Sequence, residues 1–160
     1  MAFTDQASQS PPRELAWIAG VGASAGLGAA LARRFAEEGL LAVLTGRSPE
    51  RLRALSAQIL AAGAQAHVLA GDVSSPADAA RLATQVARLG TLRAAIFNAG
   101  NMVRGTPLEL TPEQFEATWR GSAFAGFLFA RAALPRLLAA GGGSLLFTGA
   151  SASLRGRGPF

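Results

Sequence analysis

Short apolar runs alternate with longer stretches of helical pattern, and this alternation constrains the fold of the chain more than any other feature. The apolar runs cover residues 15–19, 41–45, 66–69, 94–98 and 144–148, and the helical patterns cover 27–38, 49–62, 76–89 and 112–139. The runs lack polar alternation, which is typical of strands buried on both faces of a sheet. Strand and helix in turn predict right-handed crossovers and a parallel sheet, and therefore an α/β fold.

The ends of the helical patterns have signals of their own. Ser48, Ser75 and Thr111 each precede a proline, so each sets a capping hydroxyl before a first helical residue that suits proline. Thr111 and Gln114 also have the spacing of a capping box. Glycines at 39, 63, 90 and 141–143 follow the helices, where glycine can adopt the left-handed cap conformation. With no repeat or linker between these elements, we expect a polar leader over 1–13 and one domain over 14–160.

Composition limits the chemistry that the chain can perform. Of its 160 residues half are hydrophobic, which is enough for a buried core. The absence of cysteine excludes disulfide scaffolds and thiolate metal sites, and a single histidine excludes a histidine-rich cluster. Tyrosine is absent, and all fifteen basic residues are arginine. A mechanism that needs a phenol or an amine side chain cannot run on this chain alone.

The net charge of +5 makes nucleic acid a partner to consider. The arginines are scattered, however, mostly over predicted helix surfaces, and no aromatic residues interleave with them. Nucleic acid is therefore the weaker interpretation. The first residues lack the pattern of a secretory signal, and the longest uncharged apolar stretch, 121–130, is shorter than the roughly 20 residues of a membrane span. We expect a soluble cytoplasmic protein without a membrane segment.

A glycine-rich segment, residues 20–28, lies between the first apolar run and the first helical pattern. Its glycines let the backbone turn sharply, approach a pyrophosphate and set the N-terminus of the following helix against it. Ser24 adds a hydroxyl that can donate to a phosphate. Between a buried strand and a helix, this segment predicts a dinucleotide site. A tight turn with packing glycines is the plainer alternative.

Arg47 follows the second apolar run. At this place an NAD site has an acidic residue that accepts a hydrogen bond from the ribose 2′-hydroxyl. A guanidinium can instead pair with the 2′-phosphate of NADP, in a charge-assisted contact of about 1.5–3 kcal/mol. The sequence thus favours NADP over NAD, and the alternative for Arg47 is a surface arginine that precedes a helix.

Three motifs follow one another in the order and spacing of a known family. They are Gly22-x-x-x-Gly26-x-Gly28, Asp72-Val73 and Asn98-Ala99-Gly100. On these motifs the chain resembles the short-chain dehydrogenase/reductase family, from about residue 15 to residue 160. Val21 stands where that family usually has a threonine, and Phe97 where it usually has an asparagine.

The resemblance implies a Rossmann-like, doubly wound parallel sheet with five strands in the order 3-2-1-4-5, helices on both faces and a site at the carboxyl ends of the strands. Asp72 would accept a hydrogen bond from the adenine amino group while the Val73 backbone contacts the ring. Asn98 would end its strand beneath the nicotinamide ribose. The cofactor-binding residues implied for the nicotinamide dinucleotide are Gly22, Ser24, Ala25, Gly26, Leu27, Gly28, Arg47, Asp72, Val73, Asn98, Ala99 and Gly100.

The family's chemistry is hydride transfer between the nicotinamide and a small carbonyl or alcohol substrate. A tyrosine acts as acid and base, a lysine lowers its pKa, a serine binds the substrate oxygen and an asparagine supports a proton relay. Tyrosine and lysine are absent here. Ser122 stands at the place of the asparagine, and the place of the serine falls on Ala150 or, after a shift of one residue, on Ser151.

The sequence stops a few residues before the place of the family's Tyr-x-x-x-Lys segment. We therefore expect a truncated oxidoreductase that keeps the cofactor half of the site. The alternatives are a non-catalytic nucleotide-binding module or a regulatory subunit. The helix over 112–139 is commonly a subunit interface in the family, which implies a homo-oligomer. The aromatic residues expected to serve core and interface packing in it are Phe115, Trp119, Phe124, Phe127 and Phe129.

Overall fold

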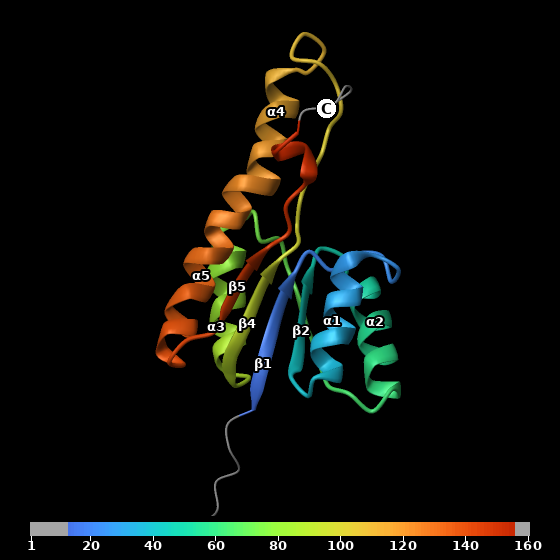
Figure 1. The fold of residues 1–160 in the computed structure, drawn as a ribbon, viewed down its shortest axis with the longest axis vertical. Coiled ribbons are helices and arrows are strands. Elements are labelled where there is room, and N and C mark those ends of the chain that lie inside the picture. Colours follow the sequence, from blue (N-terminus) through green and yellow to red (C-terminus); the bar gives the residue numbers. More distant parts are fainter. Residues whose placement is uncertain (1–12, 156–160) are drawn as a thin grey trace, which may run out of the picture.

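Five parallel strands form one sheet in the order β3-β2-β1-β4-β5. The computed structural model describes residues 13–155 (Figure 1). The strands are β1 (Glu14–Ala19), β2 (Leu41–Gly46), β3 (Ala66–Ala70), β4 (Thr91–Phe97) and β5 (Ser144–Phe147). The predicted strand order and the Rossmann-like architecture are confirmed.

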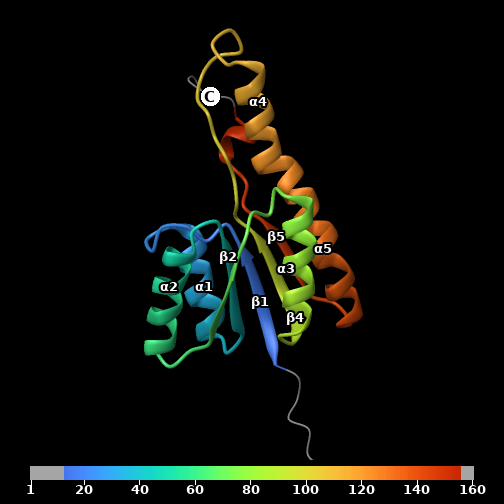
Figure 2. The same cartoon turned by 180° about the vertical axis from the view of Figure 1, so that it is seen from behind.

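Helices cover both faces of this sheet. They are α1 (Leu27–Glu37), α2 (Pro49–Ala61), α3 (Pro76–Ala87), α4 (Pro112–Trp119) and α5 (Ala125–Ala139), with a π-helix (Arg120–Phe124) between the last two and a 3-10 turn (Ser151–Ser153) after β5. α1 and α2 lie on one face, and α3 and α5 lie on the other (Figure 1 and Figure 2).

The predicted helix signals are confirmed. Ser48, Ser75 and Thr111 each accept a hydrogen bond from the backbone N–H three residues on, and Thr111 forms a capping box with Gln114. Glycines 39, 63, 90, 141 and 142 have positive φ, whereas Gly143 does not. Gly143 instead lets the chain pass close to β4, because a Cβ there would lie 2.6 Å from the Arg93 carbonyl oxygen.

Each face of the sheet has its own core. On the α3 and α5 side, Trp17 is fully buried and its ring centroid lies 4.6 Å from that of Phe129. The Trp17 Nε1–H donates to Thr45 Oγ1 at 2.9 Å, which joins β1 to β2 inside the core. On the other side, three buried alanines of α1, at positions 29, 32 and 36, let this helix approach the sheet closely.

The edge strands correct one prediction. β1, β2 and most of β4 are buried, but Leu146 and Phe147 of β5 are 47% and 52% exposed. β5 has β4 as its only strand neighbour in the described chain, and α5 packs against it. Burial on both faces was therefore the wrong expectation for this run and also for 66–69, since β3 at the other edge buries only Leu69. The lack of polar alternation in so short a run did not distinguish an edge strand from a central one.

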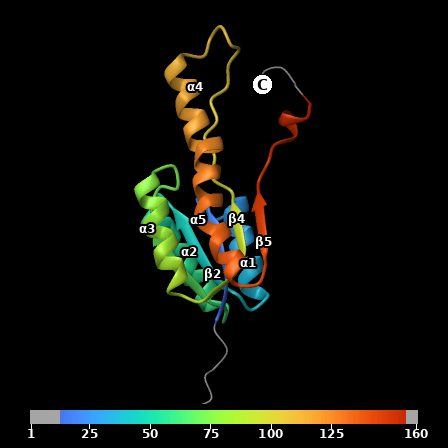
Figure 3. The same cartoon turned by 90° about the vertical axis from the view of Figure 1, so that its left-hand side faces the viewer.

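The helix over 112–139 differs from its prediction in two ways. It is interrupted by the π-helical turn, and α4 has no buried residue because it projects beyond the carboxyl ends of the strands (Figure 3). Of the five aromatic residues expected to pack, only Phe129 lies in the core, while Phe115, Trp119 and Phe127 are exposed. The expectation of core packing is thus wrong for these three.

The same helical run, Pro112–Ala139, is long and apolar enough to cross a membrane by length and composition alone. The uncharged stretch 121–130 gave too short a length for this helical run, because the run continues through Arg120 and Arg131 at the two ends of the stretch. Core helices of other proteins pass the same test, and this one packs Phe129, Ala133 and Leu137 against the sheet. It is weak evidence for a membrane span.

Candidate cofactor site

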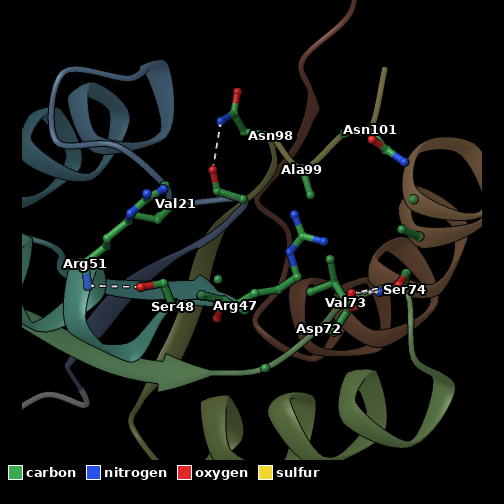
Figure 4. Close-up of a pocket in the computed structure, with 18 residues that line it drawn as sticks. Val21, Arg47, Ser48, Arg51, Asp72, Val73, Ser74, Asn98, Ala99 and Asn101 are labelled. Carbon is green, nitrogen blue, oxygen red and sulfur yellow. Dashed lines mark hydrogen bonds between the residues drawn. The ribbon is translucent and has the colours of Figure 1, made fainter. Parts of the chain in front are cut away.

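The loops after β1, β2, β3 and β4 converge on a cavity of about 350 Å³ at the carboxyl ends of the strands (Figure 4). Its size falls within the ordinary range for small-molecule sites. Seven of the predicted cofactor residues line it: Gly22, Arg47, Asp72, Val73, Asn98, Ala99 and Gly100. The structure thus brings residues from four separate loops together, as the sequence predicted.

Gly20 is one of the residues that line this cavity. It follows β1 with φ of 88°, and a Cβ on it would collide with the backbone of Ala99. Its N–H and that of Val21 donate to the Thr45 carbonyl oxygen at 2.9 and 3.0 Å, so the loop folds over the end of β2. Gly20 was not among the predicted site residues. Its position directly after the first strand, in a glycine-rich segment, was the available signal.

Asn98 connects the glycine loop to the far side of the site. Its Nδ2 donates to the Gly20 carbonyl oxygen at 3.1 Å, and its Oδ1 accepts from the Thr148 hydroxyl at 2.9 Å (Figure 4 shows the first bond). Gly28 lies beneath it, because a Cβ at position 28 would be 3.0 Å from Asn98 Nδ2 and 2.7 Å from the Gly20 carbonyl oxygen. Asn98 therefore fixes β1, β4 and the residue after β5 relative to one another.

The N-terminus of α1 differs from those of α2, α3 and α4. Its N-cap is Gly26, which offers no side-chain cap, whereas the other three have a serine or threonine cap. The Gly26 N–H donates to the Ala23 carbonyl oxygen, and the Ala29 N–H donates to the Gly26 carbonyl oxygen. The N–H groups of Leu27 and Gly28 are therefore the ones in this turn that need a partner from outside the helix. The space in front of Gly22 is open, since a Cβ there would meet no atom within 4 Å. Gly22 lines the cavity, and the uncapped helix end that follows it suits an anion.

Five further predicted residues, Ser24, Ala25, Gly26, Leu27 and Gly28, do not line the cavity. Ser24, Ala25 and Leu27 are exposed on the turn that leads into α1. The Ser24 carbonyl oxygen accepts from Arg33 Nη1 at 3.0 Å, which holds the turn against its own helix. Their backbone groups lie beside the uncapped helix end, outside the walls of the cavity.

Two arginines line the β2 side of the cavity. Figure 4 shows the Arg47 guanidinium in the middle of the view, between Val73 and Ala99, and Arg51 also lines the cavity. Arg51 stands on the first turn of α2, where its N–H donates to Ser48 Oγ at 3.4 Å. Sequence reasoning missed Arg51, although its spacing of four residues from Arg47 was visible.

One carboxylate, that of Glu50, stands on the same first turn of α2 as Arg51. The Ser48 hydroxyl donates to Glu50 Oε2 at 3.0 Å. The backbone N–H of Glu50 and then this hydroxyl lower the pKa of the Glu50 carboxyl. Glu50 is exposed and does not line the cavity.

Asp72 and Val73 form the β3 side of the cavity. Asp72 Oδ1 accepts from the Ser74 N–H at 2.9 Å and from the Ser74 hydroxyl at 2.7 Å, so the carboxylate is held in one orientation (Figure 4). No hydrogen bond from residues 13–155 is recorded at Asp72 Oδ2. Val73 is buried beside it. The β3 side of the cavity thus offers the oriented carboxylate of Asp72 next to the apolar Val73.

A second hollow of about 470 Å³ adjoins the first and shares Asn98, Ala99 and Gly100 with it. Ser122 and Ala150 line this hollow, and Ser151 does not. The Ser122 hydroxyl donates to the Asn101 carbonyl oxygen and accepts from its N–H, both at 3.1 Å. Both of these bonds join the hydroxyl to backbone. Of the two alternatives for the serine's place, the one that faces this hollow has no hydroxyl.

The residues present fit a dinucleotide. Glycines let the backbone come close, an uncapped helix end offers N–H groups, and two guanidinium groups lie on the same cavity. The cavity can thus bind a ligand with several phosphate groups. Comparison with known proteins supports the same interpretation.

A family model described as short chain dehydrogenase matches residues 16–159. The chain is 38% identical over 141 residues to oxidoreductase asL5 of Sarocladium schorii, which covers 86% of this chain and 55% of that protein. It is 35% identical over 136 residues to an A-factor type gamma-butyrolactone 1'-reductase of Streptomyces virginiae, which covers 83% and 53%. The chain spans about half the length of the curated relatives that it matches.

Solved structures agree with the fold. A short-chain dehydrogenase from Rhodopseudomonas palustris is 33% identical, with a TM-score of 0.85 over 92% of this chain and 68% of that one. A metagenomic short-chain oxidoreductase in complex with NADP is 35% identical, with a TM-score of 0.76 over 84% and 61%. Given a family model that matches nearly the whole sequence, and these relatives above 30% identity, the chain belongs to the short-chain dehydrogenase family of oxidoreductases, which bind NAD(P).

Proposed function

We propose that the chain binds NADP in the cavity at the carboxyl edge of its sheet, as the cofactor-binding part of an oxidoreductase that acts on a small carbonyl or alcohol. One observation supports this most directly: two arginines, Arg47 and Arg51, line the same cavity as Gly22, which stands on the loop that leads into the uncapped end of α1. Backbone N–H groups at the helix end suit a pyrophosphate, and guanidinium groups suit a 2′-phosphate.

The other walls have complementary tasks in this proposal. Asp72 Oδ2 accepts a hydrogen bond from the adenine amino group, and the Val73 backbone contacts the ring. The small residues Ala99 and Gly100, after Asn98, leave room for the nicotinamide ribose. The bound nicotinamide supplies or accepts a hydride. The hollow beside Ser122 shares these residues with the cavity, which suits it to hold the substrate.

A nucleotide-binding module without catalysis is not favoured. The similar proteins are called an oxidoreductase, a gamma-butyrolactone 1'-reductase and a glucose 1-dehydrogenase. One structural neighbour is a complex with NADP, and another, a polyketide ketoreductase, is a complex with NADPH. These relatives support an oxidoreductase that uses the phosphorylated cofactor.

Calorimetric titration of the purified chain tests the binding step. NADPH should bind about tenfold more tightly than NADH, because one charge-assisted contact to a 2′-phosphate is worth about 1.5–3 kcal/mol before solvent screening. The fragment 2′,5′-ADP should exceed 5′-AMP by a similar factor. Arg47→Gln should remove most of this preference. Arg53→Gln, on the exposed side of α2 and outside the cavity, is the matched control.

Two results would contradict the proposal. Absence of saturable binding by both dinucleotides would reject the cofactor site. Equal affinity for NADPH and NADH would reject the role of Arg47.

We propose hydride transfer as the activity of the oxidoreductase to which this cofactor-binding part belongs, and not of the 160-residue chain by itself. The chain spans about half the length of its relatives, and it has no tyrosine. We expect the 160-residue chain to bind NADPH without reducing a carbonyl compound. Turnover by this chain, measured as loss of NADPH absorbance, would show that protons reach the substrate without the phenol that the family resemblance implies.

We also propose self-association through the helical run 112–139. Phe115, Trp119 and Phe127 are exposed on it. Exposed aromatic side chains on one helix are typical of subunit interfaces. Sedimentation equilibrium should show a dimer or larger species that Phe127→Ser weakens, and a monomer at all concentrations would contradict this assignment.

A further inference from the structure

Two side chains of α3 bind the open edge of the sheet at the end of β3. β3 has β2 as its only neighbour in the described chain. The Gly71 N–H, just after β3, donates to the Gly46 carbonyl oxygen at 3.0 Å, on the β2 side. Successive residues of a strand direct their backbone groups to opposite sides. The Ala70 carbonyl and the Asp72 N–H therefore face the open edge, where a sixth strand would bind.

Asp78 and Arg81 satisfy both of these groups. The Asp72 N–H donates to Asp78 Oδ2 at 2.9 Å, and Arg81 Nη2 donates to the Ala70 carbonyl oxygen at 3.0 Å. The two side chains are joined to each other, with Asp78 Oδ1 at 2.7 Å from Arg81 Nη2 and 3.1 Å from Arg81 Nε. Together they present one acceptor and one donor to the edge, as the backbone of a neighbouring strand would.

Gly71 makes this contact possible. A Cβ at position 71 would lie 2.7 Å from Arg81 Nη2 and 3.2 Å from Asp78 Oδ2. Any other residue would push the ion pair away from the strand. On the other side of the pair, Arg81 Nη1 donates to Gln85 Oε1 at 3.1 Å, which fixes the guanidinium along α3.

The charge state of Asp78 agrees with this geometry. The Asp72 N–H, and after it the Arg81 guanidinium, hold the pKa of the Asp78 carboxyl below its usual value of 3.8. Asp78 is therefore ionised at neutral pH, when it accepts both bonds.

We propose that Asp78 and Arg81 are positioning residues, which replace a sixth strand at the end of β3 and so hold Asp72 and Val73 against the adenine of the bound nucleotide. The inference rests on the proposed function for its ligand, but its structural part stands apart from it. Ser74 orients the Asp72 carboxylate, and the ion pair fixes the backbone from which that carboxylate extends.

Adenine discrimination tests the positioning role. NADPH is compared with its hypoxanthine analogue, which lacks the amino group proposed to donate to Asp72. The wild-type chain should bind NADPH about tenfold more tightly, the value of one hydrogen bond to a charged group. Asp78→Ala should bring the ratio close to one. Asp78→Asn, which keeps an oxygen to accept the Asp72 N–H, should retain most of it.

Hydrogen exchange of the Asp72 amide, followed by NMR on the free chain, tests the edge contact without any nucleotide. Asp78→Ala should accelerate it at least tenfold, and Asp78→Asn much less. Arg34→Ala is the matched control, because it removes an exposed ion pair with Glu38 on α1, away from this edge. It should alter neither exchange at Asp72 nor adenine discrimination.

The outcomes separate the two proposals. If the wild-type chain binds no dinucleotide, the proposed function fails while the exchange rates still report on the edge contact. Unchanged exchange at Asp72 in Asp78→Ala would overturn the edge contact. Faster exchange with intact adenine discrimination would overturn the positioning role. If Asp78→Ala does not fold, Asp78→Ser removes the carboxylate that accepts the Asp72 N–H in its place, and its discrimination ratio and exchange rate are judged by the same criteria.

Discussion

The two edges of the sheet are completed in opposite ways. At the β3 edge, α2 packs on the strand, and the open backbone groups at its end are bound by Asp78 and Arg81. At the β5 edge, Leu146 and Phe147 are about half exposed, and α4 beyond it buries none of its residues. This difference matches the position of the candidate site. The loop after β3, with Asp72 and Val73, is proposed to contact the nucleotide and needs a fixed backbone to do so. The residues proposed to bind the cofactor thus all lie within 13–155.

Among the substitutions that compare the candidate site with the rest of the chain, we expect the largest loss of stability and of NADPH binding at Gly20. Gly20→Ala adds a left-handed conformational cost of about 1–2 kcal/mol to a clash with Ala99 worth about 1–3 kcal/mol. The free energy of unfolding, measured in urea, should fall by the sum of these costs, and NADPH binding should be lost.

Gly39→Ala is the matched control for this change. Gly39 has φ of 87°, almost the same as Gly20, but a Cβ on it would meet no atom within 4 Å. It should lose only the conformational part, about 1–2 kcal/mol. Equal destabilisation of the two variants would mean that close packing against Ala99 does not matter.

A smaller effect should separate the buried centre from the β5 side. Thr45→Val removes the acceptor of the fully buried Trp17 N–H, and an unpaired buried donor costs about 1–3 kcal/mol. Thr148→Val removes a bond to Asn98 at an exposed position, where water can replace it, so about 0.5–1 kcal/mol is expected. Urea unfolding of both variants measures the two losses of stability. A larger loss for Thr148→Val would contradict the expectation that the buried bond at Thr45 stabilises the fold more than the exposed bond on the β5 side.

Local signals account for what the sequence could predict. Serine or threonine before proline, and glycine after a helix, depend on backbone conformation within a few residues, so the helix ends were predictable from local signals. The strand order came instead from the family resemblance. Pairing of Asp78 with Arg81 has helical spacing, but its contact with β3 depends on which strand lies at the edge. Exposure of Phe115 depends on how far a helix projects past the sheet, which residue pattern does not encode.

Arg51 illustrates the limit of the site prediction. Arg47 could be predicted from its position directly after the second apolar run, where a dinucleotide site contacts the ribose. Arg51 reaches the same cavity only because α2 begins at Pro49, directly after the N-cap Ser48, which sets its first turn over the loop. A helix start that is known to one residue is needed before such a side chain can be assigned.

Arg51→Gln should weaken NADPH about twofold and leave NADH almost unchanged, since Arg47 accounts for most of the expected tenfold preference. The side chain is exposed, so its charge-assisted contact is worth less than the roughly 1.5–3 kcal/mol of a shielded one. Calorimetry at low and high salt measures the effect, which should shrink as salt screens it. Identical losses for NADPH and NADH would show that Arg51 contacts a part common to both cofactors.

The smallest effect expected concerns acid. Because the folded-state pKa of Asp78 lies below its unfolded value of 3.8, its stabilisation is fully present above that value and is lost as pH falls through the lower, folded value. Asp78→Asn should therefore be less stable than the wild type at pH 6, and the difference should shrink below about pH 3.8. The side chain is one-third exposed, so the difference should be modest. Urea midpoints of the two proteins at pH 6 and pH 3 measure it. A difference that grows toward acid would mean that ionised Asp78 opposes the fold, which is incompatible with an acceptor at the β3 edge.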